Sequence, residues 1–162
     1  MKILICGTPG VGKSFISKKL HVDFLWPHID LSEYIKSKKL YDEYNQRYDT
    51  FTFKSKKVRN SLNKYLQPLE SYIIDTHTPE IVCKIKFDII FILKSSLNVL
   101  RQRYEIREYS EEKIQENLMC EIMNVVEEDC REIFGNTNVF VFGENCDSID
   151  YNQIVKEINV GI

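Results

Sequence analysis

The sequence predicts an α/β domain in which a parallel sheet of about five strands is covered by helices on both faces. Short runs of apolar residues alternate with longer amphipathic stretches along the 162 residues, as buried parallel strands and their crossover helices do. Three of the six glycines fall within six positions just after the first apolar run. A chain of this length is typical of one domain, so residues 1–162 are expected to fold as a single unit.

Four apolar runs are expected to form strands of this sheet, with helices formed by the amphipathic stretches between them. Each run is short, continuous and bounded by turn-forming or polar residues, as strands buried on both faces are. The expected strands are residues 2–6, 72–74, 88–93 and 139–142. The expected helices are residues 13–20, 54–66, 97–107 and 111–134, and a short one that Ser32 caps and that runs through Ile35.

The longest expected helix extends from Glu111 to about Phe134. Ser110 can accept a hydrogen bond from a free backbone amide at its start, and two glutamates in the first turn suit the positive end of the helix dipole. Apolar residues recur in it at helical spacing and are expected to face the core: Ile114, Leu118, Ile122, Val125 and Phe134.

Composition and charge exclude several classes of protein. The longest aliphatic and aromatic run, residues 89–93, is far shorter than the roughly 20 residues that span a bilayer, so no membrane partner is expected. The five cysteines show no Cys-x-x-Cys spacing, which favours reduced thiols in a cytosolic or nuclear protein. The net charge of −2 hides a basic first half and an acidic second half, which fits either a bound anion or solvated helix faces.

A glycine-rich motif, GTPGVGKS at residues 7–14, connects the first strand to the first helix. In such a loop the backbone N–H groups converge on phosphate oxygens, where side chains would block their approach. Lys13 is expected to contact the terminal phosphates and Ser14 to offer its hydroxyl to Mg²⁺. A dinucleotide fingerprint does not fit, because Phe15 stands where its third glycine would be. The motif predicts a nucleoside triphosphate site.

Two polar side chains follow the second apolar run. Asp75 closes that strand, where phosphoryl-transfer folds place an acid that holds Mg²⁺, usually through water, although a turn or helix cap would also explain it. His77 could orient a water molecule or a phosphate, or serve as a hydrogen-bonded structural residue. His21 and His28 belong to no pattern that points to chemistry.

Two arginines lie on one face of the helix expected after the third strand. Arg103 and Arg107 are four residues apart, so they are neighbours on the helix surface. Their guanidinium groups could clamp transferring phosphates, or they could pair with Glu105 or Glu108 on a solvated face. The spacing alone leaves both interpretations open.

Together these motifs resemble the adenylate kinase isoenzyme 6 family, atypical nuclear adenylate kinases that also act in maturation of the small ribosomal subunit. The match is carried by the phosphate loop, the Asp75-Thr76-His77 strand end, residues 40–42 with 48–49, and residues 98–122. It covers nearly the whole chain up to about residue 129. The resemblance implies a three-layer P-loop NTPase fold of the nucleoside-monophosphate-kinase type.

The resemblance also implies a function. It is that of an Mg²⁺-dependent adenylate kinase, converting ATP and AMP to two ADP, with ATPase activity. Further implied are a role in 18S-type rRNA maturation, a small-subunit ribosomal protein and the pre-40S particle as partners, and a location in nucleus and cytoplasm. The alternatives are a nucleotide-switched assembly factor with little kinase flux, or a kinase for another nucleoside monophosphate. Direct RNA contact by the basic residues 54–57 is left open.

Residue roles follow from the same resemblance. It implies a monophosphate-binding segment at about residues 30–53 and a lid at about residues 106–116, both of which close over bound nucleotides. Catalysis is assigned to Lys13, Asp75, His77, Arg103 and Arg107, and Mg²⁺ binding to Ser14 and Asp75. ATP binding is assigned to Gly10, Val11, Gly12, Lys13, Ser14, Phe15 and Arg107, and monophosphate binding to Lys36, Tyr41 and Asp49.

The chain departs from the family pattern at several positions. Lys36 stands where the family usually has an arginine, and a point charge in place of a bidentate fork is expected to weaken AMP binding. Glu108 occupies a lid position where glycine is common. Several family residues are missing between His77 and Pro79, and the segment after Gly143 is short, which puts partner-binding elements in question.

Overall fold

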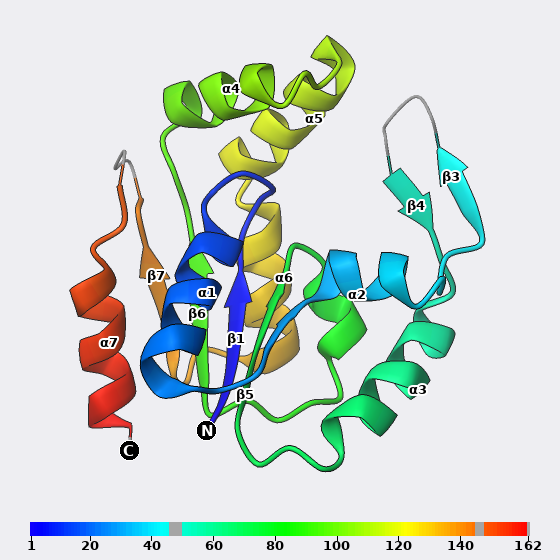
Figure 1. Cartoon of the computed structure of the whole chain (residues 1–162). Helices are drawn as coiled ribbons and strands as arrows, with labels where there is room; N and C mark the ends of the chain where they lie inside the picture. The colour runs from blue at the N-terminus through cyan, green and yellow to red at the C-terminus, as the bar shows by residue number, and fades with distance from the viewer. Residues whose placement is uncertain (46–49, 145–147, 162) are drawn as a thin grey trace.

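A five-stranded parallel sheet forms the centre of the computed structural model, which describes residues 1–45, 50–144 and 148–161. Helices cover both of its faces, so the molecule has the three layers that the sequence predicts (Figure 1). The strand order is β2-β5-β1-β6-β7. The strands are β1 (Lys2–Cys6), β2 (His28–Asp30), β5 (Tyr72–Thr76), β6 (Ile89–Leu93) and β7 (Val139–Phe142).

The central strand β1 divides the core into two parts, one on each face of the sheet. Leu4 and Cys6 point to a face covered by α2 (Leu31–Ser37), α3 (Ser55–Leu66) and α6 (Val125–Phe134). Ile3 and Ile5 point to the other, covered by α1 (Lys13–Phe24), α7 (Tyr151–Val160) and parts of α4 (Leu97–Ile106) and α5 (Glu111–Ile122). Because successive side chains of a strand alternate in direction, a strand buried on both faces reads as a continuous apolar run.

The expected helix at residues 111–134 is wrong as a single element. Asn124 adopts the left-handed conformation, with φ of 54°, and separates α5 from α6. Asparagine tolerates this conformation better than most residues, so it ends one helix and begins the next at an angle. Because of the break, Ile122 and Val125, which were expected to face the core, are exposed. Val126 and Cys130 are buried in their place. The Ser110 cap is confirmed, since its side chain accepts a hydrogen bond from Lys113 N.

Several elements of the structure were not expected from the sequence. Strand β2 has only three residues, and α7 follows a segment in which no helix was expected. A hairpin of β3 (Glu43–Asn45) and β4 (Thr50–Thr52) stands apart from the main sheet, beyond α2 (Figure 1). The cap of α2 is Asp30, which accepts a hydrogen bond from Glu33 N at 3.1 Å, so the expected Ser32 cap is wrong.

Two further features of the described residues concern the cysteines and the lengths of the helices. Cys6, Cys83, Cys120 and Cys130 are free thiols. Over the described ranges, no helix is long and apolar enough to cross a membrane. A short 3₁₀ helix at Pro79–Val82 completes the chain between β5 and β6.

Candidate active site

The carboxyl ends of four neighbouring strands meet at one edge of the sheet and carry the polar residues of the site. The glycine-rich loop follows β1, and Asp30 ends β2 directly beside Asp75 on β5. Lys94 follows β6 on the other side of β1. Open parallel sheets bind ligands at this edge because the loops from adjacent strands diverge there.

The phosphate loop folds around the side chain of Lys13. Its ammonium group donates hydrogen bonds to the carbonyl oxygens of Gly7 at 2.7 Å and Thr8 at 3.1 Å. Burial lowers the pKa of Lys13, while the carboxylates of Asp75 and Asp30 oppose that shift. Helix α1 begins at Lys13, and Gly12 offers it no side-chain cap. The amides of its first turn therefore face the loop as donors suited to an anion.

Two carboxylates converge on the hydroxyl of Ser14. The Oγ atom of Ser14 lies 3.1 Å from Oδ2 of Asp30 and 3.5 Å from Oδ1 of Asp75. Hydroxyl and carboxylate oxygens are hard ligands, and Mg²⁺ in nucleotide sites is held by one or two carboxylates together with phosphates. The residues present therefore fit Mg²⁺. Asp30 was missed by the sequence reasoning, because it ends a strand of three residues in which only Ile29 is buried.

His28 contacts the catalytic carboxylate predicted at Asp75. Its Nε2 atom lies 2.6 Å from Oδ2 of Asp75, and both side chains are largely buried. No sequence pattern pointed to His28, since the two partners are 47 positions apart and belong to different strands. The hydrogen bond fixes one oxygen of Asp75 and leaves the other facing Ser14.

Helix α4 contacts the tip of the phosphate loop. Arg103 donates from Nη1 to the carbonyl oxygen of Gly10 at 2.6 Å, and the hydroxyl of Tyr104 donates to the carbonyl oxygen of Pro9 at 2.5 Å. Glu105, one of the pairing partners considered for these arginines, instead pairs with Arg101. Arg103 thus lies at the loop, as a phosphate clamp requires.

A cavity of about 340 Å³ opens beside the loop. Phe15 lies at its edge with 68% of its surface exposed. The size of the cavity suits a nucleotide. It brings together five of the seven residues to which ATP binding was assigned: Gly10, Val11, Gly12, Phe15 and Arg107. Arg103, assigned to catalysis, lines it as well.

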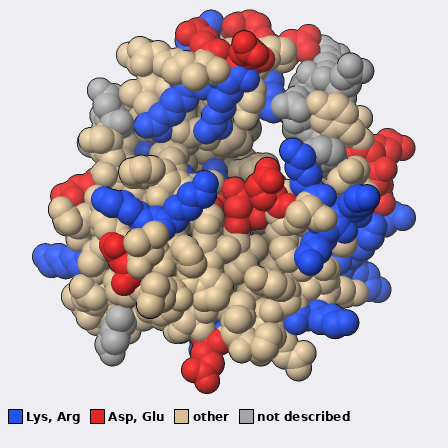
Figure 2. Space-filling model, in the orientation of Figure 1, with Lys and Arg blue, Asp and Glu red and all other residues tan. Residues whose placement is uncertain are grey.

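The residues assigned to the monophosphate lie on a different segment. Lys36 is exposed in the last turn of α2, and Tyr41 is half-buried between α2 and the hairpin. Asp49 lies outside the described residues. Figure 2 shows the surface hollowed between this segment and the α4–α5 pair, with basic and acidic side chains around the hollow. The roles of Lys36, Tyr41 and Asp49 stay predictions.

His77 lies just past Asp75, exposed at the mouth of the concave site. Desolvation, together with the charge of Lys13, lowers the pKa of His77 to about 4, against the opposing effect of the Asp30 carboxylate. The ring is therefore neutral at physiological pH in the nucleotide-free protein.

An NMR titration of the nucleotide-free protein should place the midpoint of His77 near pH 4. The unfolded chain takes up this proton near pH 6.5, so protonation favours unfolding as the pH falls from 6.5 toward 4. The variant His77→Gln should accordingly lose less stability than the wild type over that window. A midpoint at or above the ordinary histidine value would contradict this environment for His77.

Comparisons with known proteins show which family the chain belongs to. A family model of the AAA domain matches residues 3–124. The chain is 34% identical to the adenylate kinase isoenzyme 6 homolog of Plasmodium falciparum, over 93% of this chain and 89% of the relative. The chain belongs to the adenylate kinase isoenzyme 6 family. The Dictyostelium discoideum homolog of this family is 30% identical over 82% of the chain and 75% of its own length.

Solved structures agree with the fold of this adenylate kinase isoenzyme 6 family member. The deoxyadenosine kinase from M. mycoides with bound dATP superposes with a TM-score of 0.59 at 19% identity, over 98% of this chain and 100% of that chain. Shikimate kinase from Bacteroides thetaiotaomicron gives a TM-score of 0.59 at 20% identity, over 99% and 95%. The resemblance seen in the motifs is confirmed, and the chain is an adenylate-kinase-like nucleotide kinase.

Proposed function

We propose that this protein transfers the γ-phosphoryl group of ATP to AMP, forming two ADP, and hydrolyses ATP more slowly. The observation that carries the proposal is the convergence of Ser14, Asp30 and Asp75 beside the phosphate loop. Membership of the adenylate kinase isoenzyme 6 family supports AMP as the acceptor.

In this reaction a phosphate oxygen of AMP forms a bond to the γ-phosphorus, and the bond from that phosphorus to the bridging oxygen of ADP breaks. The chain supplies position and charge. The loop amides and the start of α1 hold the phosphates, and a bound phosphate offers Lys13 a charged acceptor in place of two carbonyl groups. When bound with ATP, Mg²⁺ neutralises charge on the phosphates.

Arginine side chains from α4 complete the charge stabilisation. Arg103 already donates to the loop carbonyl of Gly10, so a short movement of its fork brings it to a phosphate beside the loop. Arg107 lines the same cavity. Closure of residues 106–116 over the nucleotides would exclude water from the transfer. In the slower hydrolysis, His77 is placed to orient water near Asp75.

A coupled assay with ATP, Mg²⁺ and a panel of nucleoside monophosphates tests the proposal. ADP formation should depend on AMP more strongly than on dAMP, CMP, UMP or GMP. Absence of monophosphate-dependent ADP formation would exclude the kinase, and stronger dependence on another monophosphate would replace AMP as the acceptor.

The variant Lys36→Arg should lower the KM for AMP several-fold while changing the KM for ATP little. A guanidinium fork makes two hydrogen bonds to a phosphate where an ammonium group acts as a point charge. The exposed position of Lys36 at the end of α2 leaves room for the larger side chain. Lys39→Arg, in the exposed turn just after α2, is the matched control, and an equal effect at both positions would contradict a specific role for Lys36.

A nucleotide-switched role in assembly of the small ribosomal subunit, in nucleus and cytoplasm, is the second candidate function. It is supported by family resemblance, with a small-subunit ribosomal protein and the pre-40S particle as partners. The test is His77→Gly in a cell that depends on this protein. Loss of growth or rRNA processing with phosphoryl transfer retained would support the switch, and joint loss would not.

A further inference from the structure

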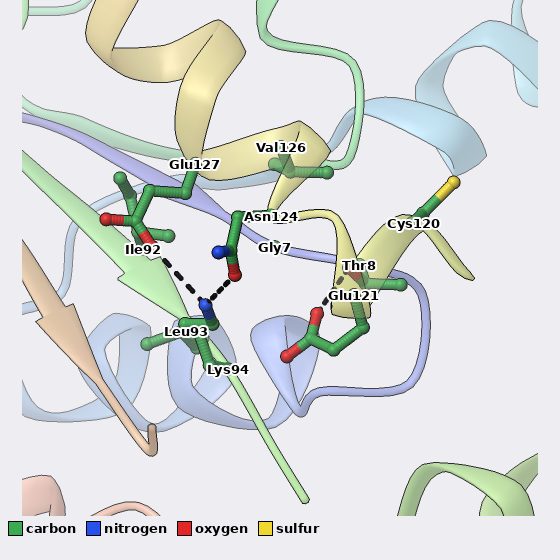
Figure 3. Close-up of a pocket in the computed structure, with 10 residues that line it drawn as sticks. All are labelled: Gly7, Thr8, Ile92, Leu93, Lys94, Cys120, Glu121, Asn124, Val126 and Glu127. Atoms are coloured by element: carbon green, nitrogen blue, oxygen red, sulfur yellow. Dashed lines mark hydrogen bonds and ion pairs between the residues drawn. The ribbon is translucent and has the colours of Figure 1, made fainter. Parts of the chain in front are cut away.

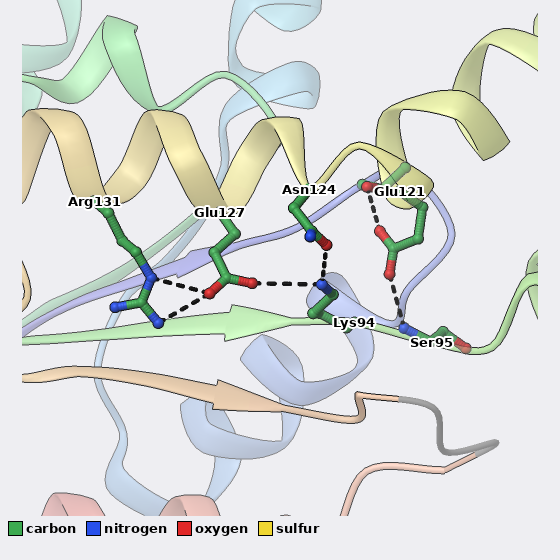
Figure 4. Close-up of polar contacts among 7 residues, drawn as sticks. Lys94, Ser95, Glu121, Asn124, Glu127 and Arg131 are labelled. Atoms are coloured by element: carbon green, nitrogen blue, oxygen red, sulfur yellow. Dashed lines mark hydrogen bonds and ion pairs between the residues drawn. The ribbon is translucent and has the colours of Figure 1, made fainter.

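A buried carboxylate joins three separate segments behind the phosphate loop. Glu121, near the end of α5, accepts a hydrogen bond from the hydroxyl of Thr8 at 2.5 Å and another from the backbone N–H of Ser95 at 3.1 Å. Thr8 is the second residue of the loop, and Ser95 lies between β6 and α4 (Figure 4). All three residues are buried. One side chain therefore holds the loop and the two ends of the α4–α5 pair.

A second group of contacts lies beside the first. Lys94 donates to the side-chain oxygen of Asn124, and its Nζ atom is 3.4 Å from Oε2 of Glu127, which in turn pairs with Arg131 (Figure 4). Lys94 precedes α4 and Asn124 separates α5 from α6. The chain therefore enters α4 and leaves α5 at neighbouring places, and hydrogen bonds and an ion pair join the two places.

The surroundings of Glu121 leave it little freedom. The cavity next to it, lined by Gly7, Thr8, Lys94 and Cys120 among others, has a volume of about 10 Å³ (Figure 3). That is about the space of one water molecule, so the carboxylate has little room to move independently of Thr8. Its two hydrogen-bond donors are uncharged, and burying a carboxylate against neutral donors costs more than filling the space with an apolar side chain. Stability alone therefore does not account for a glutamate here.

The loop is held to the α4–α5 pair at its start and at its tip. Glu121 holds its start through Thr8, while Arg103 and Tyr104 of α4 hold its tip through the carbonyl oxygens of Gly10 and Pro9. A change in the loop on phosphate binding would reach α4 and α5 through these contacts, because a closely packed interior transmits strain.

We propose that Glu121 is a positioning residue, which keeps the phosphate loop in register with the α4–α5 pair so that nucleotide in the loop sets the position of the lid. The inference rests on the proposed function for its ligand, an adenine nucleotide. It assigns Glu121 no contact with substrate. Its effect reaches the reaction through Thr8 on the loop and through the arginines that α4 carries.

The variant Glu121→Gln tests this role, with Glu128→Gln, an exposed glutamate on the neighbouring helix α6, as control. The amide has one acceptor oxygen and an NH₂ donor, so it cannot accept hydrogen bonds from both Thr8 and Ser95 through its two ends. We expect kcat to fall by at least about tenfold, since small misplacements of reacting groups are costly, while the KM for ATP changes little. Glu128→Gln should match the wild type.

Hydrogen exchange measured at saturating ADP and Mg²⁺ gives a second readout. In the wild type, nucleotide should slow exchange both in the loop and in residues 97–122, whereas in Glu121→Gln it should slow exchange in the loop only. Thr8→Val breaks the same contact from the other side while keeping the shape of the side chain. In Thr8→Val, too, nucleotide should slow exchange in the loop only. This variant provides the test of the role of Glu121 if Glu121→Gln does not fold.

The outcomes separate this inference from the proposed function. Wild-type kcat and wild-type protection of residues 97–122 in both variants would overturn the role of Glu121 while leaving an active kinase. A wild type that binds ADP with the expected protection but makes no ADP from AMP would overturn the proposed reaction, and loss of protection of residues 97–122 in both variants would still support the inference. A wild type that binds no adenine nucleotide would overturn both.

Discussion

Replacing Lys13 with methionine should reduce phosphoryl transfer from ATP by at least about 100-fold, because one charged donor to the transferring group is removed from a preorganised site. The ammonium group is buried, and burial lowers its pKa, so its charge is unfavourable in the folded state without a ligand. Methionine has a similar length and no charge. It forfeits two hydrogen bonds to the carbonyl groups of Gly7 and Thr8, but it also removes the buried charge. We therefore expect the thermal midpoint to stay the same or to rise.

The matched control is Lys18→Met, an exposed lysine on the same helix. It should keep wild-type kcat and a similar thermal midpoint. Steady-state kinetics and a thermal unfolding curve on the three proteins are sufficient. A Lys13→Met protein that retains more than a tenth of wild-type kcat would contradict the catalytic assignment. Loss of activity together with loss of fold would contradict the argument from buried charge.

The sequence predicted the part of the site that is contiguous along the chain. The phosphate loop is one strand, one turn and one helix start, and each of these is encoded by neighbouring residues. Asp75 could be found because it ends an apolar run, which marks the carboxyl end of a buried strand. The four predicted strands are confirmed for the same reason, since strands buried on both faces have a continuous apolar pattern.

The residues that escaped prediction are joined only by the tertiary fold. Glu121 and Thr8 are 113 positions apart, and Glu121 looks like one of several glutamates on an amphipathic helix. Strand β2 is too short to show a pattern, which hid both Asp30 and His28. The break at Asn124 could not be anticipated, because the sequence there contains neither proline nor glycine and the helical spacing continues through it. The hydrogen bond from Lys94 stabilises the turn at Asn124, but Lys94 reaches it only when β6 has taken its place in the sheet.

Replacing Gly7 with alanine should destabilise the fold by about 3 kcal/mol or more, since crowding in a packed core and an unfavourable φ add to each other. A Cβ atom at this position would lie 2.3 Å from the carbonyl oxygen of Leu93 and 2.8 Å from a methyl group of Val11. The first contact is with backbone at the end of β6, which is hydrogen-bonded within the sheet and cannot withdraw as a side chain would. In a domain of this size, that loss corresponds to a fall of roughly 6–12 °C in the thermal midpoint.

Gly135→Ala separates crowding from backbone strain. Gly135 also has a positive φ, of 78°, but a Cβ atom there would meet nothing within 4 Å. Its ψ of −160° puts it in a region that glycine almost alone occupies, so an L-residue there should cost about 1–3 kcal/mol without any added crowding. Urea unfolding of both variants measures the difference, and the kinase assay should show that Gly7→Ala also loses activity while Gly135→Ala keeps it. Equal destabilisation at the two positions would mean that the end of β6 can move away from Gly7. That result would contradict the view that a rigid contact between Gly7 and Leu93 fixes the start of the phosphate loop and so the position of Lys13.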